Sequence, residues 1–289
     1  MEAFVRVVEL GGFSRAAEEL HVSQPSVSAY IAALEKELGA VLINRSRGVF
    51  LVTSAGEHFL GHARKMLTLK RESIEALHTF SGEVIGQVRI LASSVPALYI
   101  LPRLLAGFHR LHPKVSFDVR SADTAGVVAG LSAHKADVGF AGSMLGQGKC
   151  DFMPFANERL VLIAPPDSPL REDEPYPLAE LLYEHCFIAR EHGSGTRLEY
   201  EKFLGGSGVT LEKIRTVASM DSTQGIINAV AGGLGVSIVS ELAATQNRDR
   251  LKVVRLQNEL PVRDIYAVLR TNTARSHLVE LFMEYVTRR

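Results

Sequence analysis

The chain has 289 residues, of which 46% are apolar and 22% charged, so it is long enough for two folded domains with ordinary cores. Its 32 basic and 32 acidic residues balance, which excludes a uniformly basic protein but leaves room for a local phosphate-binding patch. It has no apolar run of membrane-spanning length, no recognisable secretory signal and no metal-ligand spacing around its two cysteines, Cys150 and Cys186. We therefore expect a cytoplasmic protein without a metal, in which burial and a redox pair both stay open for the cysteines.

The N-terminal part carries the signals of short helices joined by tight turns. After an apolar helix over Glu2–Leu10, Ser14 offers an N-cap hydroxyl to a second helix. Ser23 caps a third helix, Pro25 sits in its first turn, where the missing N–H costs nothing, and Gly39 ends it. Two short helices around one tight turn predict a helix-turn-helix, with an ordinary helical hairpin as the alternative.

The third helix has the side chains expected at a DNA major groove. Its outward face is built from small residues, which allow the backbone to come close, and polar residues gather at its leading end. Glutamine can pair with adenine through two hydrogen bonds, and serine hydroxyls suit phosphates or base edges. The predicted DNA-binding residues of this helix are Ser23, Gln24, Pro25, Ser26, Ser28 and Tyr30.

A basic turn between two short strand-like segments follows within Val41–Thr53. Such a hairpin beside a helix-turn-helix is a wing, and Arg45 and Arg47 at its turn suit phosphates or a narrow minor groove. Residues 41–71 contain six basic residues and a single acidic one, which favours contact with DNA. A solvated helix face would show the same excess of positive charge.

A long helix is predicted from Ser54 to Phe80, beginning with a capping box formed by Ser54 and Glu57. Apolar residues recur along it at alternating spacings of three and four, interrupted by Lys70, which is the pattern of a heptad seam. The helix is therefore predicted to pair with its twin in a homodimer, and packing on its own domain is the alternative. The predicted dimerisation residues are Leu60, Ala63, Leu67, Ile74 and Leu77.

The run SRAAEELHVSQPSVSAYIAALEKELGAVLINRSRGVFLVTSAG, which begins at Ser14, resembles the DNA-binding domain of the LysR-type transcriptional regulators. The skeleton AA–SQP–S–I–LE–LG–L–R–TSAG is continuous and ordered, and the match covers nearly all of residues 3 to 56. The resemblance implies a winged helix-turn-helix over residues 1–56, a linker helix over 57–80 and an effector-binding domain over 88–289.

The same resemblance assigns roles to individual residues. It implies that Ser23, Gln24, Pro25 and Ser26 lie at the groove and that Arg45, Arg47 and Thr53 contact the DNA backbone. Two features depart from the family pattern. The first family helix would begin before Met1, and Ala29 stands where many members carry arginine, so a contact common in the family is in doubt here.

Beyond a linker at 81–86, strand and helix patterns alternate as in α/β proteins. This rhythm predicts a largely parallel sheet covered on both faces, and its repetition predicts two α/β lobes. We expect the chain to cross between the lobes near 160–165 and 265–270. Lobe 1 then comprises about 88–160 plus 270–289, and lobe 2 about 161–269. Strands are predicted at 88–92, 115–120, 137–141, 160–164, 186–189, 216–220, 236–239, 251–256 and 265–269.

Three turns of this region suit a small polar or anionic ligand. Ligands of α/β sheets bind outside the carboxyl ends of strands, where helix N-termini point at them. Ser93 and Ser94, the run Gly193–Arg197 and the run Asp221–Thr223 each offer hydroxyls and free N–H groups at such a place. Each is also explained by ordinary helix capping. Arg197 beside a hydroxyl-rich turn favours an anion.

The LysR resemblance continues weakly into this region, in the runs Ala-Ser-Ser, Asp137-Val-Gly-Phe and Ala231-Gly-Gly-Leu-Gly-Val. It implies a regulatory domain that resembles periplasmic binding proteins. By this similarity the effector-binding residues are Ser93, Ser94, Thr124, Gly142, Ser194, Thr196 and Thr223.

The sequence thus predicts a ligand-gated transcriptional regulator with no catalytic residue and no cofactor besides a small co-inducer. Its expected partners are double-stranded DNA, a small anionic or polar effector and a second copy, with a tetramer and RNA polymerase as further possibilities, and no membrane. A solute-binding protein made of the two lobes is one alternative. A hydrolase using Ser194 and His192 is another, although residues two apart at a turn seldom form a nucleophile–base pair.

Overall fold

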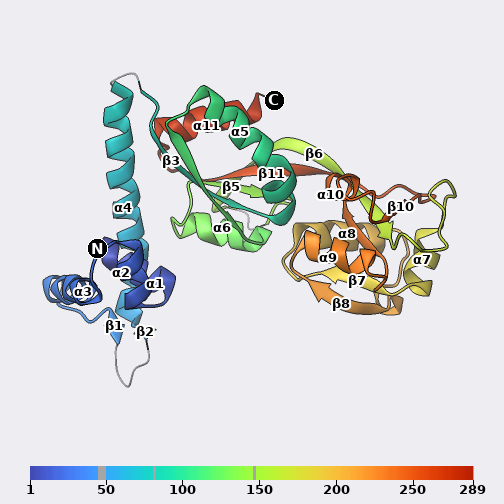
Figure 1. Cartoon of the computed structure of the whole chain (residues 1–289), viewed down its shortest axis with the longest axis horizontal. Coiled ribbons are helices and arrows are strands. Elements are labelled where there is room, and N and C mark those ends of the chain that lie inside the picture. Colours follow the sequence, from blue (N-terminus) through green and yellow to red (C-terminus); the bar gives the residue numbers. More distant parts are fainter. Residues whose placement is uncertain (45–49, 81–82, 146–147, 289) are drawn as a thin grey trace. The chain divides into compact units, whose positions relative to one another are not determined.

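The computed structural model describes residues 1–44, 50–80, 83–145 and 148–288, with the side chains of 78–80 excepted. The chain divides into two compact units (Figure 1). One contains Met1–Gly82, and the other contains Glu83–Ser132 and Ala136–Arg289. No helix among the described residues is both long enough and apolar enough to cross a membrane.

The first unit is a helix-turn-helix with a two-stranded hairpin and a long helix. Its core includes Phe4, Ile31 and Leu42, each at most 1% exposed. The elements are α1 (Glu2–Leu10), α2 (Phe13–Glu19), α3 (Gln24–Leu38), β1 (Ile43–Asn44), the antiparallel β2 (Leu51–Val52) and α4 (Ser54–Phe80).

Of the three predicted N-caps of this unit, two are wrong and one is confirmed, and Gly39 ends α3 as predicted. Helix α2 begins after Gly12 without a side-chain cap, so Ser14 lies inside the helix. The hydroxyl of Thr53, not that of Ser54, accepts a hydrogen bond from the N–H of Gly56 at 3.0 Å and caps α4. The hydroxyl of Ser23 accepts from the N–H of Ser26 at 3.2 Å, as predicted.

The first half of helix α4 packs against the core of its own unit. Ala63 is fully buried, and Leu60 and Leu67 pack on the same cluster, which is the alternative that the heptad pattern left open. Farther along, Ile74 is 47% and Leu77 67% exposed. The five predicted dimerisation residues therefore divide into a buried group and an exposed group.

The second unit has two lobes connected by two long strands. Its elements are β3 (Gly86–Ala92), η2 (Pro96–Ile100), α5 (Leu101–Leu111), β4 (Val115–Ser121), α6 (Thr124–Ser132), β5 (Val138–Ala141), β6 (Cys150–Ala164), α7 (Leu178–Glu184), β7 (Phe187–Arg190), α8 (Gly195–Gly206), η3 (Leu211–Lys213), β8 (Thr216–Met220), α9 (Thr223–Ala231), β9 (Ser237–Ser240), α10 (Glu241–Thr245), β10 (Lys252–Val254), β11 (Val262–Arg270) and α11 (His277–Thr287).

In lobe 1, helices cover both faces of the sheet, as the sequence predicted. Helices α5 and α11 cover one face and α6 the other (Figure 1). Along β3 the faces alternate, because Ile90 packs in the α5–α11 cluster and Leu91 in the α6 cluster. Lobe 2 has its own clusters, built from β7, β9 and β10 with α7, α8, α9 and α10.

The sheet is mixed, which corrects the prediction of a largely parallel one. Among the described residues a seven-stranded sheet runs in the order β10-β6-β11-β5-β3-β4, with β9 also paired to β6. Within this sheet only β3, β4 and β5 are mutually parallel, whereas β11 is antiparallel to both β5 and β6; the separate pair β7 and β8 is parallel. Strand β6 begins at Cys150, ten residues before the predicted strand. The sequence analysis missed its first part because polar residues interrupt the apolar pattern there.

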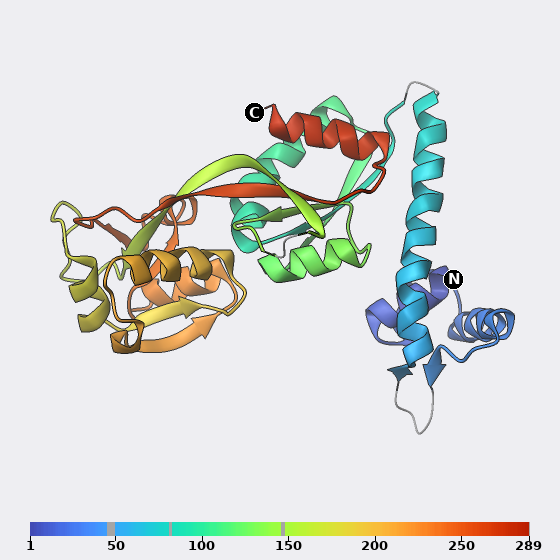
Figure 2. The same ribbon diagram turned by 180° about the vertical axis from the view of Figure 1, so that it is seen from behind.

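Strands β6 and β11 lie side by side and connect the lobes (Figure 2). Their register places Arg263 opposite Glu158. The crossing strands thus bring two charged residues into the region between the lobes.

The close packing of Gly56 generates a test of the first unit. A Cβ atom at Gly56 would lie 2.2 Å from the carbonyl oxygen of Leu42, which is backbone and cannot rotate away. Gly56→Ala should therefore destabilise this unit by about 1–3 kcal/mol. Hydrogen exchange of residues 1–77, followed by mass spectrometry, should rise. Gly61→Ala in the same helix is the matched control, because nothing lies within 4 Å of its Cβ position, and it should slow exchange slightly. Equal exchange in the two variants would contradict the packing at Gly56.

Candidate functional site

The leading end of α3 presents the polar side chains predicted to contact DNA. Ser23, Gln24 and Pro25 are exposed, and Tyr30 is 54% exposed. The side chains form a local network, in which the Gln24 amide donates to the Ser28 hydroxyl at 3.3 Å. These bonds are weak and solvent-exposed, so the side chains can exchange them for bonds to DNA.

The predicted contacts around the hairpin have different outcomes. Arg45 and Arg47 lie outside the described residues. The Thr53 hydroxyl donates to the carbonyl of Val41 at 2.7 Å while it caps α4, so its hydrogen-bonding capacity serves the fold. A contact of Thr53 with the DNA backbone stays a prediction.

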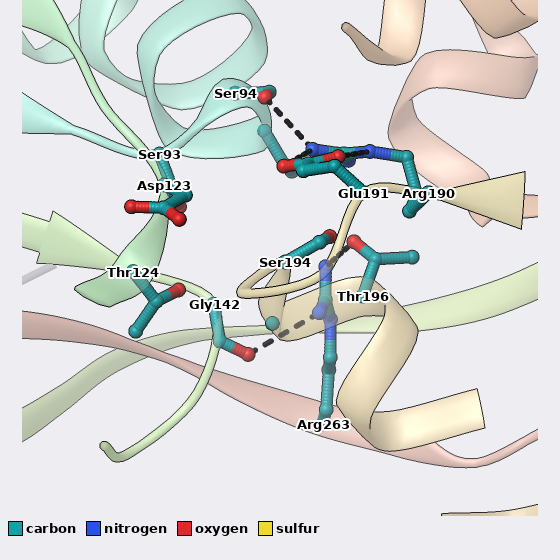
Figure 3. A pocket seen from close by; sticks show the side chains of 12 residues that line it. Ser93, Ser94, Asp123, Thr124, Gly142, Arg190, Glu191, Ser194, Thr196 and Arg263 are labelled. Atoms are coloured by element: carbon teal, nitrogen blue, oxygen red, sulfur yellow. Dashed lines mark hydrogen bonds and ion pairs between the residues drawn. The ribbon is translucent and has the colours of Figure 1, made fainter. Parts of the chain in front are cut away.

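A small pocket, partly open to solvent, lies between the two lobes and is called the cavity below (Figure 3). Lobe 1 contributes the turns after β3, β4 and β5, and lobe 2 contributes the turn between β7 and α8, so the carboxyl ends of four strands converge here. The lining residues are Ser93, Ser94, Val95, Asp123, Thr124, Gly142, Arg190, Glu191, Ser194, Gly195, Thr196 and Arg263.

Every predicted effector-binding residue except Thr223 lines this cavity. Thr223 lies behind the lining, where its hydroxyl accepts a hydrogen bond from Nη1 of Arg190 at 2.9 Å. Arg197, which had favoured an anion, does not line the cavity. It donates to Glu201 at 2.7 Å and to the carbonyl oxygen of Arg190 at 2.9 Å.

Arg190 is the first of two arginines that the sequence analysis missed. It ends β7, is 4% exposed, and uses its guanidinium on both lobes. Its Nε and Nη2 donate to the two carboxylate oxygens of Glu191 at 2.8 and 2.9 Å. Nη2 also donates to the hydroxyl of Ser94 in lobe 1 at 3.3 Å (Figure 3). Its place directly after the predicted apolar strand at 186–189 is the signal that could have indicated it.

Arg263 forms a buried ion pair with Glu158 between the crossing strands. The Nε of Arg263 donates to Glu158 at 2.8 Å, and the side chains are 4% and 0% exposed. Arg263 also donates to the carbonyl of Gly142 at 3.2 Å and to the hydroxyl of Thr196 at 3.0 Å (Figure 3). Ser240 donates to the other carboxylate oxygen of Glu158. The pair therefore connects both lobes and the crossing strands.

Two hydroxyls beside the cavity have no hydrogen-bond partner among the described residues. Thr124 Oγ1 and Ser143 Oγ are both buried, and both lie close to Gly195, at 3.1 and 2.7 Å from its ideal Cβ position. Buried hydroxyls without partners are costly, so they favour a polar group that enters the cavity and bonds to them.

A third contact between the lobes lies beside the cavity. The phenol of Tyr99 in η2 donates to the side-chain oxygen of Gln224 in α9 at 3.4 Å. Burial raises the pKa of Tyr99 above its ordinary value of 10.0, so it stays a neutral donor near pH 7.

The charged side chains lining the cavity are two arginines and two carboxylates. Arg190 is bonded to Glu191, Arg263 is bonded to Glu158 behind the lining, and Asp123 adds a further carboxylate. One carboxylate oxygen of Asp123 accepts from the N–H of Gly126 at 2.6 Å at the start of α6. The cavity is therefore polar without being a free anion site as it stands.

Each of the two units matches a known protein family. A family model described as "LysR substrate binding domain" matches residues 81–289, and one described as "Bacterial regulatory helix-turn-helix protein, lysR family" matches residues 1–57. The chain belongs to the LysR family of transcriptional regulators. The predicted family and fold class are thereby confirmed, and the enzyme alternative falls away.

Individual relatives of this LysR-family regulator match over most of its length. The RuBisCO operon transcriptional regulator of Allochromatium vinosum is 32% identical over 288 residues, which is 99% of this chain and 94% of the relative. Full-length CbnR complexed with its target DNA shares the fold with a TM-score of 0.74 at 24% identity, covering 99% and 97% of the two chains. The regulatory domain of CcmR from Synechocystis PCC6803, in complex with 2-PG, has a TM-score of 0.64 at 24% identity over 70% of this chain and 96% of that domain.

The buried ion pair of this LysR-family regulator predicts a large effect of a single substitution. Arg263→Met leaves Glu158 buried without its counter-charge and should destabilise the second unit by about 3–5 kcal/mol in urea unfolding followed by circular dichroism. Adding Glu158→Leu should restore most of the loss, because the unpaired charge is removed. Arg288→Met, which breaks an exposed pair with Glu284, is the control and should cost less than about 1 kcal/mol. A small loss from Arg263→Met alone would argue against a structural role for the pair.

Gly195 predicts how closely the lobes approach. A Cβ atom there would lie 2.7 Å from Ser143 Oγ and 3.1 Å from the carbonyl carbon of Gly142, both in lobe 1. Gly195→Ala should therefore separate the lobes locally and speed hydrogen exchange in residues 140–145 and 195–198. Gly205→Ala in the same helix has open space around its Cβ position and should leave these segments unchanged. The close approach would be refuted by unchanged exchange in both variants.

Proposed function

We propose that this regulator reads DNA with the leading end of α3 and that a small polar effector, bound in the cavity between the lobes, changes its DNA binding. The two unpartnered buried hydroxyls, Thr124 Oγ1 and Ser143 Oγ, carry the effector part of the proposal. They are held at a converging set of strand ends, where a ligand would satisfy them.

The DNA part of the proposal rests on α3. Its exposed face includes the small residues Ala29, Ala32 and Ala33, and the polar residues Ser23, Gln24 and Ser26 lie at its leading end. A helix with such an end can enter a major groove with its first turn against the base edges. Gln24 is the residue best suited to read a base, because its amide both donates and accepts.

We also propose that the chain acts as a homodimer through the exposed part of α4. Ile74 and Leu77 from the predicted seam are exposed, and Met66 and Leu69 are 43% and 65% exposed. Apolar side chains that protrude along one long helix favour pairing with a second copy. Leu60, Ala63 and Leu67 would then support α4 from within the first unit.

An effector acts only if it binds two conformations with different affinity. The contacts of Ser94 with Arg190, of Gly142 with Arg263, and of Tyr99 with Gln224 connect the lobes in the present conformation. A ligand that bonds to hydroxyls of both lobes would stabilise one spacing of the lobes over another. This differential stabilisation is the source of control in the proposed mechanism.

Gln24→Ala tests the DNA reading directly. With DNA from upstream of the protein's own gene, fluorescence anisotropy should show tight binding that resists competitor DNA and weakens steeply with salt. The substitution should reduce affinity for this DNA about tenfold or more, because a two-point base contact contributes about 1–3 kcal/mol. Affinity for scrambled DNA should stay unchanged and serves as the internal control. Weak wild-type binding that is equal for all sequences would refute sequence-specific recognition by this chain.

A further inference from the structure

We propose that Glu191 occupies, from within the chain, the place on Arg190 that an acid group of the effector takes, so that an anionic effector binds by displacing Glu191. This proposal rests on the proposed function, since it specifies the effector class and the competition at the same cavity. It replaces Arg197 by Arg190 as the residue that recognises an anion.

The arrangement of Arg190 is that of a carboxylate receptor already filled. A guanidinium presents Nε and one Nη as a planar fork that matches the two oxygens of a carboxylate. Glu191 fills this fork with distances of 2.8 and 2.9 Å. Thr223 accepts from Nη1 and Ser94 accepts from Nη2, which is also a fork nitrogen, and these two bonds fix the plane of the guanidinium. The fork faces the cavity, whose lining includes both Arg190 and Glu191 (Figure 3).

Glu191 can leave this position at low cost. Its side chain is 22% exposed, and it lies in the loop between β7 and α8. Gly193, two residues on, has a φ of +94°, which suits glycine in a tight turn, and the backbone N–H of Glu191 is bonded to the carbonyl of Met220, so the side chain can move while the backbone stays in place. When the Glu191 carboxylate moves into solvent it is hydrated again, and this hydration offsets part of the loss of its bonds to Arg190.

The other arginine of the cavity is not available in the same way. Arg263 shares its guanidinium with Glu158, which is fully buried, lies within the β6–β11 ladder and accepts a further bond from Ser240. Removing Glu158 from this place would disrupt the connection between the lobes. Of the two arginines that line the cavity, only Arg190 therefore has an exchangeable counter-ion.

The charge around Arg190 agrees with an exchange. With Glu191 in place, an incoming anion meets an arginine whose charge is already neutralised. When the carboxylate of the ligand replaces that of Glu191, the net charge around Arg190 stays the same. The ligand also reaches the unpartnered hydroxyl of Thr124 and those of Ser93 and Ser94, which gives it bonds to lobe 1 that Glu191 does not make. Competition by Glu191 thus lowers the apparent affinity for simple anions and favours anions with further polar groups.

Substitution of Glu191 tests the competition with simple probes. Calorimetric titration of the full chain with inorganic phosphate and with acetate, at constant ionic strength, compares the wild type with Glu191→Gln and Glu191→Ala. Freeing a charge-assisted fork should strengthen binding of these anions about tenfold or more. Glu284→Gln is the matched control, because it removes the same charge and frees Arg288 on the exposed helix α11. The double variant Arg190→Lys with Glu191→Gln should lose the gain, because lysine cannot form the fork.

Each result decides the proposal. A gain in both Glu191 variants that the control lacks and the double variant loses supports it. Equal anion binding in the wild type, both Glu191 variants and the control overturns it, as does a gain that survives Arg190→Lys. The same preparations are assayed for DNA binding by anisotropy. If the wild type binds specific DNA but the Glu191 variants show no gain in anion binding, only the competition is refuted. If the wild type does not bind DNA sequence-specifically, the proposed function is refuted.

Discussion

The buried ion pair between Arg263 and Glu158 is the interaction on which the architecture of the second unit depends. Two charges removed from water are tolerated only when their hydrogen-bonding groups are satisfied, and here Gly142, Thr196 and Ser240 satisfy them. These partners come from lobe 1, from lobe 2 and from the strand beside the crossing. The requirement to pair the charges therefore fixes where the lobes meet and holds the strand ends that line the cavity.

The two arginines of the cavity follow the same chemistry with different outcomes. The carboxylate partner of Arg263 is Glu158, which lies in a strand ladder, is fully buried and accepts a further hydrogen bond from Ser240. Arg190 has a carboxylate partner in a loop with partial exposure. The first arrangement builds structure, and the second provides a place where a ligand can compete. A polar cavity in which Arg190 has an exchangeable partner is thus compatible with a ligand that carries an acid group and further groups that bond to hydroxyls.

The linker helix α4 has a partly buried first half and an exposed second half, which a single heptad pattern does not separate. Its first half contributes Ala63 to the core of the DNA-binding unit, while Ile74 and Leu77 stay exposed. The reason is that a stripe of apolar residues records only that a face is covered, and not by which partner. Movement of the exposed part in a dimer would be felt by the DNA-binding unit, because both parts belong to one continuous helix.

The sequence by itself determined the family, the helix-turn-helix, most strands and the hydroxyl-bearing turns, because these depend on local periodicity, on caps such as Ser23 and on the residues that follow a strand. Only the tertiary structure decided the antiparallel crossing of β6 and β11, the burial of Ala63 and the cap at Thr53. It also decided the role of the charges. Arg263 and Glu158 are 105 residues apart, and no local pattern shows that they meet. Arg197, beside the hydroxyl-rich turn, is instead held by Glu201 one helical turn away. Short-range sequence patterns determine the helices and strands, whereas charge pairing between distant residues determines which arginine lines the cavity.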